Sequence, residues 1–185
     1  MQLMEDLVVL YSGGADSTLL LSMAIEMKRE PLALMIDYKQ LHIEELVYAK
    51  DFLDNYNIKN MTVEINGYNV NSGLTGSGKK GLYEGVSEFN VPARNSIFLT
   101  IAYGIAESRN INEIWFGANF EDYEHLFPDC TQEYIGRFNK MLEVAAVKPI
   151  KVYAPLLGMS KEMIKHFLKQ FDIKNSEVFS GYGKL

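Results

Sequence analysis

Residues 7–17 read LVVLYSGGADS, and this stretch decides the fold class. Its first five residues are apolar and rich in strand formers, which predicts a short buried β-strand. Gly13 and Gly14 then mark a flexible turn. Behind them, Asp16 and Ser17 can cap a helix whose apolar residues recur at three- and four-residue spacing until Pro31 breaks it. The stretch therefore predicts a strand, a glycine turn and a helix in succession.

The same alternation continues along the chain. Strands that alternate with helices indicate an open, mainly parallel sheet with helices on both faces, which is a Rossmann-like α/β fold. We see no internal repeat and expect a single domain over residues 1–185. The glycine-rich segment 66–90 breaks the pattern, and we interpret it as either a long loop or a mobile lid. Further apolar runs predict strands at 32–36, 61–65, 114–116 and 150–153, and helical spacing predicts helices at 43–56, at 94–108, from 131 and from 160.

Composition excludes several classes of function. The 185 residues include 18 basic and 24 acidic side chains, for a net charge of -6. Such a chain has no general attraction for a phosphate backbone or an anionic membrane, so we expect neither a nucleic acid nor a membrane as partner. No signal peptide or membrane-spanning apolar run is visible, which predicts a cytoplasmic protein. Cys130 is the only cysteine, which excludes an intrachain disulfide and an all-cysteine zinc site.

The strongest chemical signal is the turn SGGADS at residues 12–17. In an open α/β sheet, the carboxyl ends of the strands face the ligand crevice. Two glycines let the backbone approach a ligand closely, while Ser12, Ser17 and the first helix amides offer hydrogen bonds to a phosphate. Asp16 is unusual there, because a carboxylate repels a bare phosphate. Its presence indicates either a bridging Mg²⁺ ion or a cap for its own helix.

This turn resembles the signature Ser-Gly-Gly-x-Asp-Ser of the PP-loop, or N-type ATP pyrophosphatase, superfamily. The resemblance implies the adenine nucleotide α-hydrolase-like form of the Rossmann-like fold. Later motifs extend it, in the same order, to the 7-cyano-7-deazaguanine synthase family, so that it covers roughly residues 7–165. These motifs are DYKQLH at 37–42, VPARN at 91–95, GAN at 117–119, DY at 122–123, PDC at 128–130, APL at 154–156 and SK at 160–161.

The resemblance implies an ATP-dependent carbon–nitrogen ligase of 7-deazaguanine (queuosine-type) biosynthesis. Members of the family adenylate 7-carboxy-7-deazaguanine, convert it with ammonia to the amide, and activate the amide again to give the nitrile. The resemblance also implies ATP and Mg²⁺ as cofactors and a homodimer as the assembly.

The same resemblance assigns site residues. Arg94 offers a rigid donor fork that suits a carboxylate or phosphate, and Asn119, Asp122 and Asp129 suit the N–H edge of a guanine-like base. The residues assigned to catalysis are Asp16, Ser17 and Arg94; those assigned to the nucleotide are Leu10, Ser12, Gly13, Gly14, Asp16, Ser17, Thr18 and Asp37; those assigned to the substrate are Tyr38, Gln40, His42, Arg94, Asn95, Asn119, Asp122, Tyr123 and Asp129.

One departure from the family concerns zinc. The family typically closes with a cysteine set that binds zinc and begins in a Ser-Cys-Tyr segment. The corresponding segment here is Ser180-Gly181-Tyr182, and the sequence ends at Leu185. We therefore expect a shortened form of the family without zinc. If the tail shapes the substrate pocket, the reaction changes; if it only holds the fold together, catalysis survives its loss.

Several interpretations stay open at this point. Residues 73–80, GLTGSGKK, nearly spell a Walker A loop, but Lys80 stands where a Ser or Thr should meet Mg²⁺. Lys79 and Lys80 either close over ATP phosphates or belong to a solvated loop. His42 either contacts substrate or caps a helix, and Cys130 is better interpreted as a packed thiol than as a nucleophile. Alternative functions are an adenylating enzyme that stops at the amide or uses another amine acceptor, and a non-catalytic 7-deazapurine or nucleotide binder.

Overall fold

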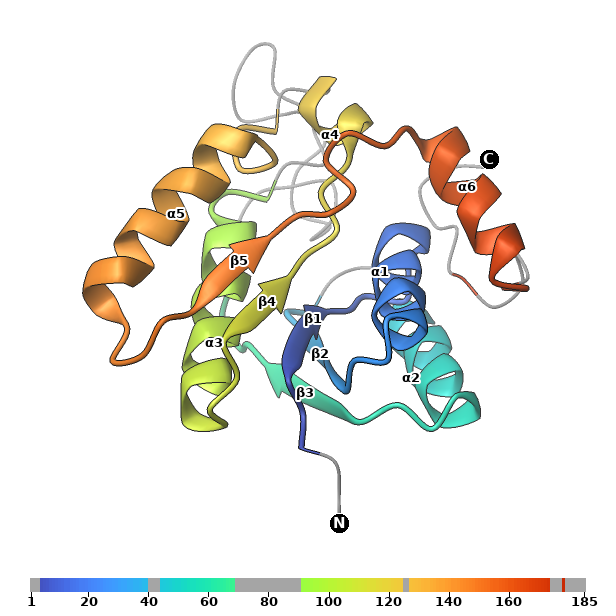
Figure 1. The fold of residues 1–185 in the computed structure, drawn as a ribbon, viewed down its shortest axis with the longest axis horizontal. Helices are drawn as coiled ribbons and strands as arrows, with labels where there is room; N and C mark the ends of the chain where they lie inside the picture. The colour runs from blue at the N-terminus through green and yellow to red at the C-terminus, as the bar shows by residue number, and fades with distance from the viewer. Residues whose placement is uncertain (1–3, 40–43, 69–90, 125–126, 174–177, 179–185) are drawn as a thin grey trace.

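The computed structural model describes residues 4–39, 44–68, 91–124, 127–173 and 178. Strands and helices alternate through most of these residues, as the sequence predicts (Figure 1). In chain order the elements are β1 (Leu7–Leu10), α1 (Ala15–Glu26), β2 (Pro31–Asp37), α2 (Glu44–Asn55), β3 (Asn60–Glu64), α3 (Arg94–Ser108), β4 (Glu113–Trp115), α4 (Phe120–Glu124), α5 (Gln132–Ala145), β5 (Lys151–Tyr153) and α6 (Lys161–Gln170).

The five strands form one sheet in the order β3-β2-β1-β4-β5, and every pairing between neighbours is parallel. The central strand β1 places Leu7 beside Pro31 of β2 and Val8 beside Ile114 of β4. The chain therefore builds outward from β1 first on one side and then on the other. This arrangement puts the carboxyl ends of β1 and β4 next to each other, where such sheets bind ligands. The predicted parallel α/β sheet is confirmed.

Helices cover both faces of the sheet. Figure 1 shows α1, α2 and α6 on one side, and α3 and α5 on the other. Successive residues of a strand point to opposite faces, so β1 contributes Leu7 and Val9 to one apolar cluster and Val8 to the other. A sheet that is buried on both faces needs apolar residues at every strand position, which explains the unbroken LVVL run of β1.

The outer edge of β5 is covered by a side chain. Asn139 of α5 donates from Nδ2 to the carbonyl of Val152 at 2.9 Å, and its Oδ1 accepts from the Val152 amide at 2.8 Å. These two backbone groups face away from β4, since β5 pairs with β4 through Lys151 N and Tyr153 O. The amide of Asn139 therefore occupies hydrogen-bonding positions that another strand would use at this edge.

The start of α1 differs from the sequence-based expectation. Gly14 is the N-cap residue and has extended backbone angles, whereas Asp16 lies in the first turn. The alternative that Asp16 caps its own helix is therefore wrong, because its carboxylate bonds to other elements. The helix also ends before Pro31. Its C-cap is Met27, and Lys28 follows in the left-handed region with φ 58°, so that Pro31 opens β2 instead.

The short helix α4 was not expected from the sequence. Five residues are too few to show helical periodicity, and its signal is the capping pair Asn119 and Asp122. Residues 69–90, most of the expected loop or lid, lie outside the described residues, as do Lys79 and Lys80. None of the helices in the described part of the chain is long and apolar enough to cross a membrane.

Candidate active site

The turn between β1 and α1 is held by its own two serines. Ser17 Oγ accepts from the Ser12 amide at 3.2 Å and donates to the Gly14 carbonyl at 3.1 Å. The two hydroxyl oxygens are 3.3 Å apart, and the Gly14 amide donates to Ser12 Oγ at 3.4 Å. The hydroxyls thus line the start of α1, where helix amides and the helix dipole favour an anion. Phosphate binding at this turn stays a prediction, and it depends on these groups at the start of α1.

Gly13 is required at this turn for two reasons. Its φ of +83° lies in the left-handed region, which side chains rarely adopt. A Cβ at this position would also lie 2.9 Å from the carbonyl oxygen of Glu45 and 3.0 Å from Cβ of Ala49, both on α2. The first turns of α2 therefore pack directly against the turn, and only glycine leaves room for both.

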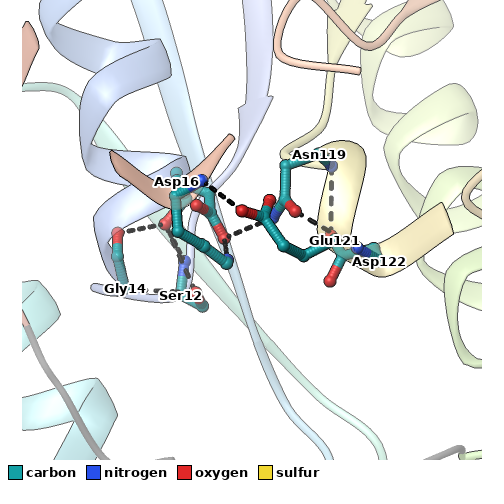
Figure 2. A network of polar contacts seen from close by, with 8 residues as sticks. Ser12, Gly14, Asp16, Asn119, Glu121 and Asp122 are labelled. Carbon is teal, nitrogen blue, oxygen red and sulfur yellow. Dashed lines mark hydrogen bonds and ion pairs between the residues drawn. The ribbon is translucent and has the colours of Figure 1, made fainter. Parts of the chain in front are cut away.

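Asp16 connects the turn to two distant segments. Its Oδ2 atom accepts from Nζ of Lys161 at 2.6 Å and from Nδ2 of Asn119 at 3.2 Å (Figure 2). Lys161 is the first residue of α6, and its backbone amide donates to Oε1 of Glu121 at 2.7 Å. Among the described residues, Asp16 Oδ1 and Glu121 Oε2 are buried atoms without a hydrogen-bond partner. The site therefore joins the ends of β1 and β4 to the start of α6.

Asn119 and Asp122 form a reciprocal cap at the start of α4. The Asp122 amide donates to Asn119 Oδ1 at 3.2 Å, and the Asn119 amide donates to Asp122 Oδ2 at 3.1 Å. Asn119 is fully buried, which leaves its Nδ2 to contact Asp16. Burial raises the pKa of Asp122, while Lys161 acts in the opposite direction. Gly117 permits the close approach of this segment to Asp16, because a Cβ at position 117 would lie 3.2 Å from Cβ of Asp16.

Arg94 begins α3 and lies at a second polar cluster. Burial raises the pKa of the Tyr38 phenol, and Arg94 opposes that shift through its charge and a hydrogen bond. Burial also raises the pKa of Tyr68, again opposed by the charge of Arg94. The Tyr68 hydroxyl donates to the carbonyl of Pro92, just before α3. Arg94 thus hydrogen-bonds to the hydroxyl of Tyr38, and its charge also acts on the hydroxyl of Tyr68.

Cys130 and Asn95 belong to the same cluster. The Asn95 amide donates to Cys130 Sγ at 3.5 Å, and Sγ lies 3.9 Å from Oδ1 of Asp129. Burial raises the pKa of the Cys130 thiol to about 12, and the nearby carboxylates of Asp122 and Asp129 act in the same direction. The thiol is therefore protonated near neutral pH, which agrees with the interpretation of Cys130 as a packed thiol and not a nucleophile.

Asp37, at the end of β2, is paired with its own neighbour. Its Oδ1 accepts from the Lys39 amide at 2.9 Å, and its Oδ2 lies 2.8 Å from Lys39 Nζ. Lys39 adopts a φ of 61° to make both contacts. Burial acts to raise the pKa of Asp37, but the hydrogen bonds and charge of Lys39 outweigh it, so the pKa is lowered. Asp37 is therefore an anion at neutral pH.

The remaining predicted residues are divided between described and undescribed parts of the chain. Leu10 ends β1 beside the turn, and Thr18 is fully buried with its hydroxyl 3.5 Å from that of Tyr11. Gln40 and His42 lie outside the described residues, as does the side chain of Tyr123.

Sequence reasoning assigned no role to Lys161 or Glu121. The motif Ser160-Lys161 was the available signal for Lys161, but its partners are distant in sequence.

The donor set fits the nucleotide and cation that the sequence implies. Serine hydroxyls and helix amides suit phosphate oxygens, and the partnerless Oδ1 of Asp16 is the hard oxygen ligand that Mg²⁺ prefers. Within the described ranges, no three His, Cys, Asp or Glu side chains lie close enough together to hold a metal by themselves. A cation here would therefore need phosphate oxygens or waters as further ligands. Ser180, Gly181 and Tyr182, on which the zinc expectation depends, lie outside the described residues.

Comparison with solved structures shows which proteins share this fold. The fold is similar to that of an NH3-dependent NAD synthetase from Campylobacter jejuni, with a TM-score of 0.61 at 16% identity over 97% of this chain and 69% of the other. It is also similar to an NMN synthetase from Francisella tularensis, with a TM-score of 0.60 at 20% identity over 96% and 69% of the two chains. The chain therefore shares the fold of these two synthetases.

The family follows from sequence comparison. The model of the family described as queuosine biosynthesis protein QueC matches residues 6–184, and the chain belongs to this family. A 7-cyano-7-deazaguanine synthase from Rickettsia prowazekii is 36% identical over 177 aligned positions, and the match covers 87% of this chain and 77% of that protein. One from Psychromonas ingrahamii is 32% identical over 168 aligned positions, and the match covers 86% of this chain and 76% of that protein. The resemblance seen in the sequence motifs, to a family of ATP-dependent ligases, is thereby confirmed.

Proposed function

We propose that this protein is a ligase that uses ATP and ammonia to convert 7-carboxy-7-deazaguanine to its amide and then to the nitrile. Relatives that carry the name 7-cyano-7-deazaguanine synthase support this activity. The structural observation that carries the proposal is the meeting of three sequence motifs at Asp16. The β1–α1 turn, Asn119 after β4, and Lys161 at the start of α6 all reach hydrogen-bonding distance there.

The residues of the turn would bind and orient the nucleotide. Ser12, Ser17 and the Gly14 amide, which are hydrogen-bonded to one another at the positive end of α1, would bind a phosphate group there. Asp16 would hold Mg²⁺, which supplies positive charge against the phosphates. When bound, ATP supplies the adenylyl group that makes a carboxylate oxygen into a leaving group. Gly13 keeps α2 close to the turn and so helps to exclude water from it.

The cluster around Arg94 would bind the deazaguanine carboxylate. A guanidinium donates two parallel hydrogen bonds to a carboxylate, and Arg94 is already oriented by its contact with Tyr38. Asp129 and Asn95 offer an acceptor and an amide beside it, which suits the polar edge of a base. Because the thiol of Cys130 is protonated, it would contribute packing here and would not attack the acyl group.

The test is a product analysis. The protein is incubated with Mg²⁺–ATP, ammonium and 7-carboxy-7-deazaguanine, and the small-molecule products are separated by mass spectrometry. We expect nitrile together with AMP and pyrophosphate. If the products are the amide without the nitrile, or an acyl group on another amine, then the protein is an adenylating enzyme with a different end product and the proposal is wrong. Binding without any AMP would replace it with a binding function.

Two serines of α1 give a matched pair of variants for this assay. Ser17→Ala removes a hydroxyl that faces the phosphate turn, and we expect a fall of about tenfold to a hundredfold in AMP formation. Ser22→Ala removes a buried hydroxyl that, among the described residues, donates to the Thr18 carbonyl within the helix. The control should keep its activity, so an equal loss in both variants would contradict the assignment of the turn to ATP.

A further inference from the structure

Lys161 links α6 to the turn between β1 and α1. Its Nζ atom lies 2.6 Å from Asp16 Oδ2, and its backbone amide is fixed by Glu121 Oε1 at 2.7 Å. Ser160 caps the same helix turn by accepting from the Met163 amide at 3.2 Å. The backbone of Lys161 is thus anchored on α4 and α6, while its side chain extends to a residue 145 positions earlier in the chain.

The ion pair neutralises Asp16 where an anion would bind. The carboxylate uses Oδ2 for Lys161 and Asn119, while Oδ1 has no partner among the described residues. The two side chains are 38% and 21% exposed for Lys161 and Asp16, so the ammonium can reach solvent and is not enclosed. Lysine carries a compact charge on a flexible four-carbon stem, and it can change partner without movement of the backbone.

We propose that Lys161 is a positioning residue whose ion pair with Asp16 opens when nucleotide and divalent cation bind. The Asp16 carboxylate then turns to the cation, and the Lys161 ammonium turns to a phosphate oxygen. This inference rests on the proposed function, because it needs ATP at the turn. It adds a regulated element to that site: the start of α6 responds to the state of the nucleotide.

The exchange makes opposite predictions for the two ligands. Without nucleotide, the Lys161 ammonium competes with a cation for Asp16, so its removal should tighten cation binding. With nucleotide present, the same ammonium contributes a charge-assisted contact, so its removal should weaken binding. A residue that only held α6 in place would shift both affinities in the same direction or neither.

Three variants test the proposal: Lys161→Met, Lys161→Arg and the control Lys140→Met, whose lysine pairs with Glu143 on the exposed face of α5. Mn²⁺ binding to the nucleotide-free protein is followed by electron paramagnetic resonance. Binding of a non-hydrolysable ATP analogue with Mg²⁺ is followed by calorimetry, and thermal melting reports on the fold. For Lys161→Met we expect Mn²⁺ to bind about threefold tighter and the analogue about tenfold or more weaker. Lys140→Met should stay near wild type in both assays, and Lys161→Arg, which keeps the charge, should shift both affinities in the same directions as Lys161→Met but by less.

The outcomes separate this inference from the proposed function. Unchanged affinities in Lys161→Met, or a parallel loss of both with a lower melting temperature, would overturn the exchange and leave Lys161 a structural residue. If the wild-type protein binds no ATP analogue, the proposed function fails. The Mn²⁺ titration still tests the resting ion pair in that case, and unchanged Mn²⁺ binding in Lys161→Met would refute it separately.

Discussion

Asn119→Asp tests the centre of the site, because it replaces one amide nitrogen by oxygen and leaves the size of the side chain unchanged. The cap of α4 survives, since a carboxylate oxygen can still accept from the Asp122 amide. The contact with Asp16 is lost, because the donor nitrogen of Asn119, 3.2 Å from Asp16 Oδ2, becomes a second carboxylate oxygen. At that distance and an effective dielectric constant of about 20, two unit charges repel by about 5 kcal/mol.

Lys161 offsets part of this repulsion, because its ammonium lies 2.6 Å from the same Asp16 oxygen. We therefore expect a loss of about 2–3 kcal/mol in the free energy of unfolding at pH 8. The repulsion raises the pKa of the introduced carboxylate in the folded protein above its unfolded value of about 3.9. The protonated form is then favoured by folding, so the loss is absent below about pH 4 and grows as the pH rises through the raised pKa.

Urea unfolding followed by circular dichroism at pH 5 and pH 8 measures both effects. Asn119→Ala is the comparison, because it removes the cap, at a cost of about 1 kcal/mol, and adds no titrating group. The reasoning is refuted if Asn119→Asp is as stable as wild type at pH 8, or if it loses the same free energy at both pH values.

Three further changes test other parts of the structure. Gly13→Ala should lose about 2 kcal/mol or more in unfolding free energy, from positive φ and the contact with Glu45, whereas Gly158→Ala, with open space around it, should melt near wild type. Asn139→Ala should lose about 2 kcal/mol and, by exposing the edge of β5, increase light scattering on storage; scattering equal to wild type would contradict the role of this amide. Burial raises the pKa of Cys130 from 9.0 to about 12, so the thiol ionises at lower pH in the unfolded protein than in the folded one. The free energy of unfolding should therefore fall above about pH 9, by up to about 1.4 kcal/mol per pH unit. Cys130→Ala should remove this contribution in urea unfolding between pH 8 and about pH 10.5.

Much of the fold could be predicted from local sequence. The helix at 94–108 was predicted with the bounds of α3, and the strand at 7–11 exceeds β1 by a single residue. These elements have apolar runs or helical spacing long enough to leave a pattern. The five-residue α4 has neither, so only a capping pair marks it. The early end of α1 depends on the left-handed conformation of Lys28, which no residue type there requires.

The site was predictable in its parts and not in its contacts. The glycines and serines of SGGADS indicate a phosphate turn by themselves, because their roles depend on neighbours in the sequence. The partners of Asp16 are 103 and 145 residues away, and no local pattern pairs a carboxylate with Asn119 or Lys161. That pairing follows from strand order, which brings the ends of β1 and β4 together and places α6 beside α1.

The span of the Asp16–Lys161 contact has a consequence for synthesis of the protein. The turn between β1 and α1 is synthesised before its ammonium partner, which is made 145 residues later. At about 5–20 residues per second, the gap lasts roughly 7–30 seconds. During that interval the nascent chain carries Asp16 without the ammonium group of Lys161. Under the proposed function, nucleotide affinity is therefore acquired late in translation, after the five described strands of the sheet have been made.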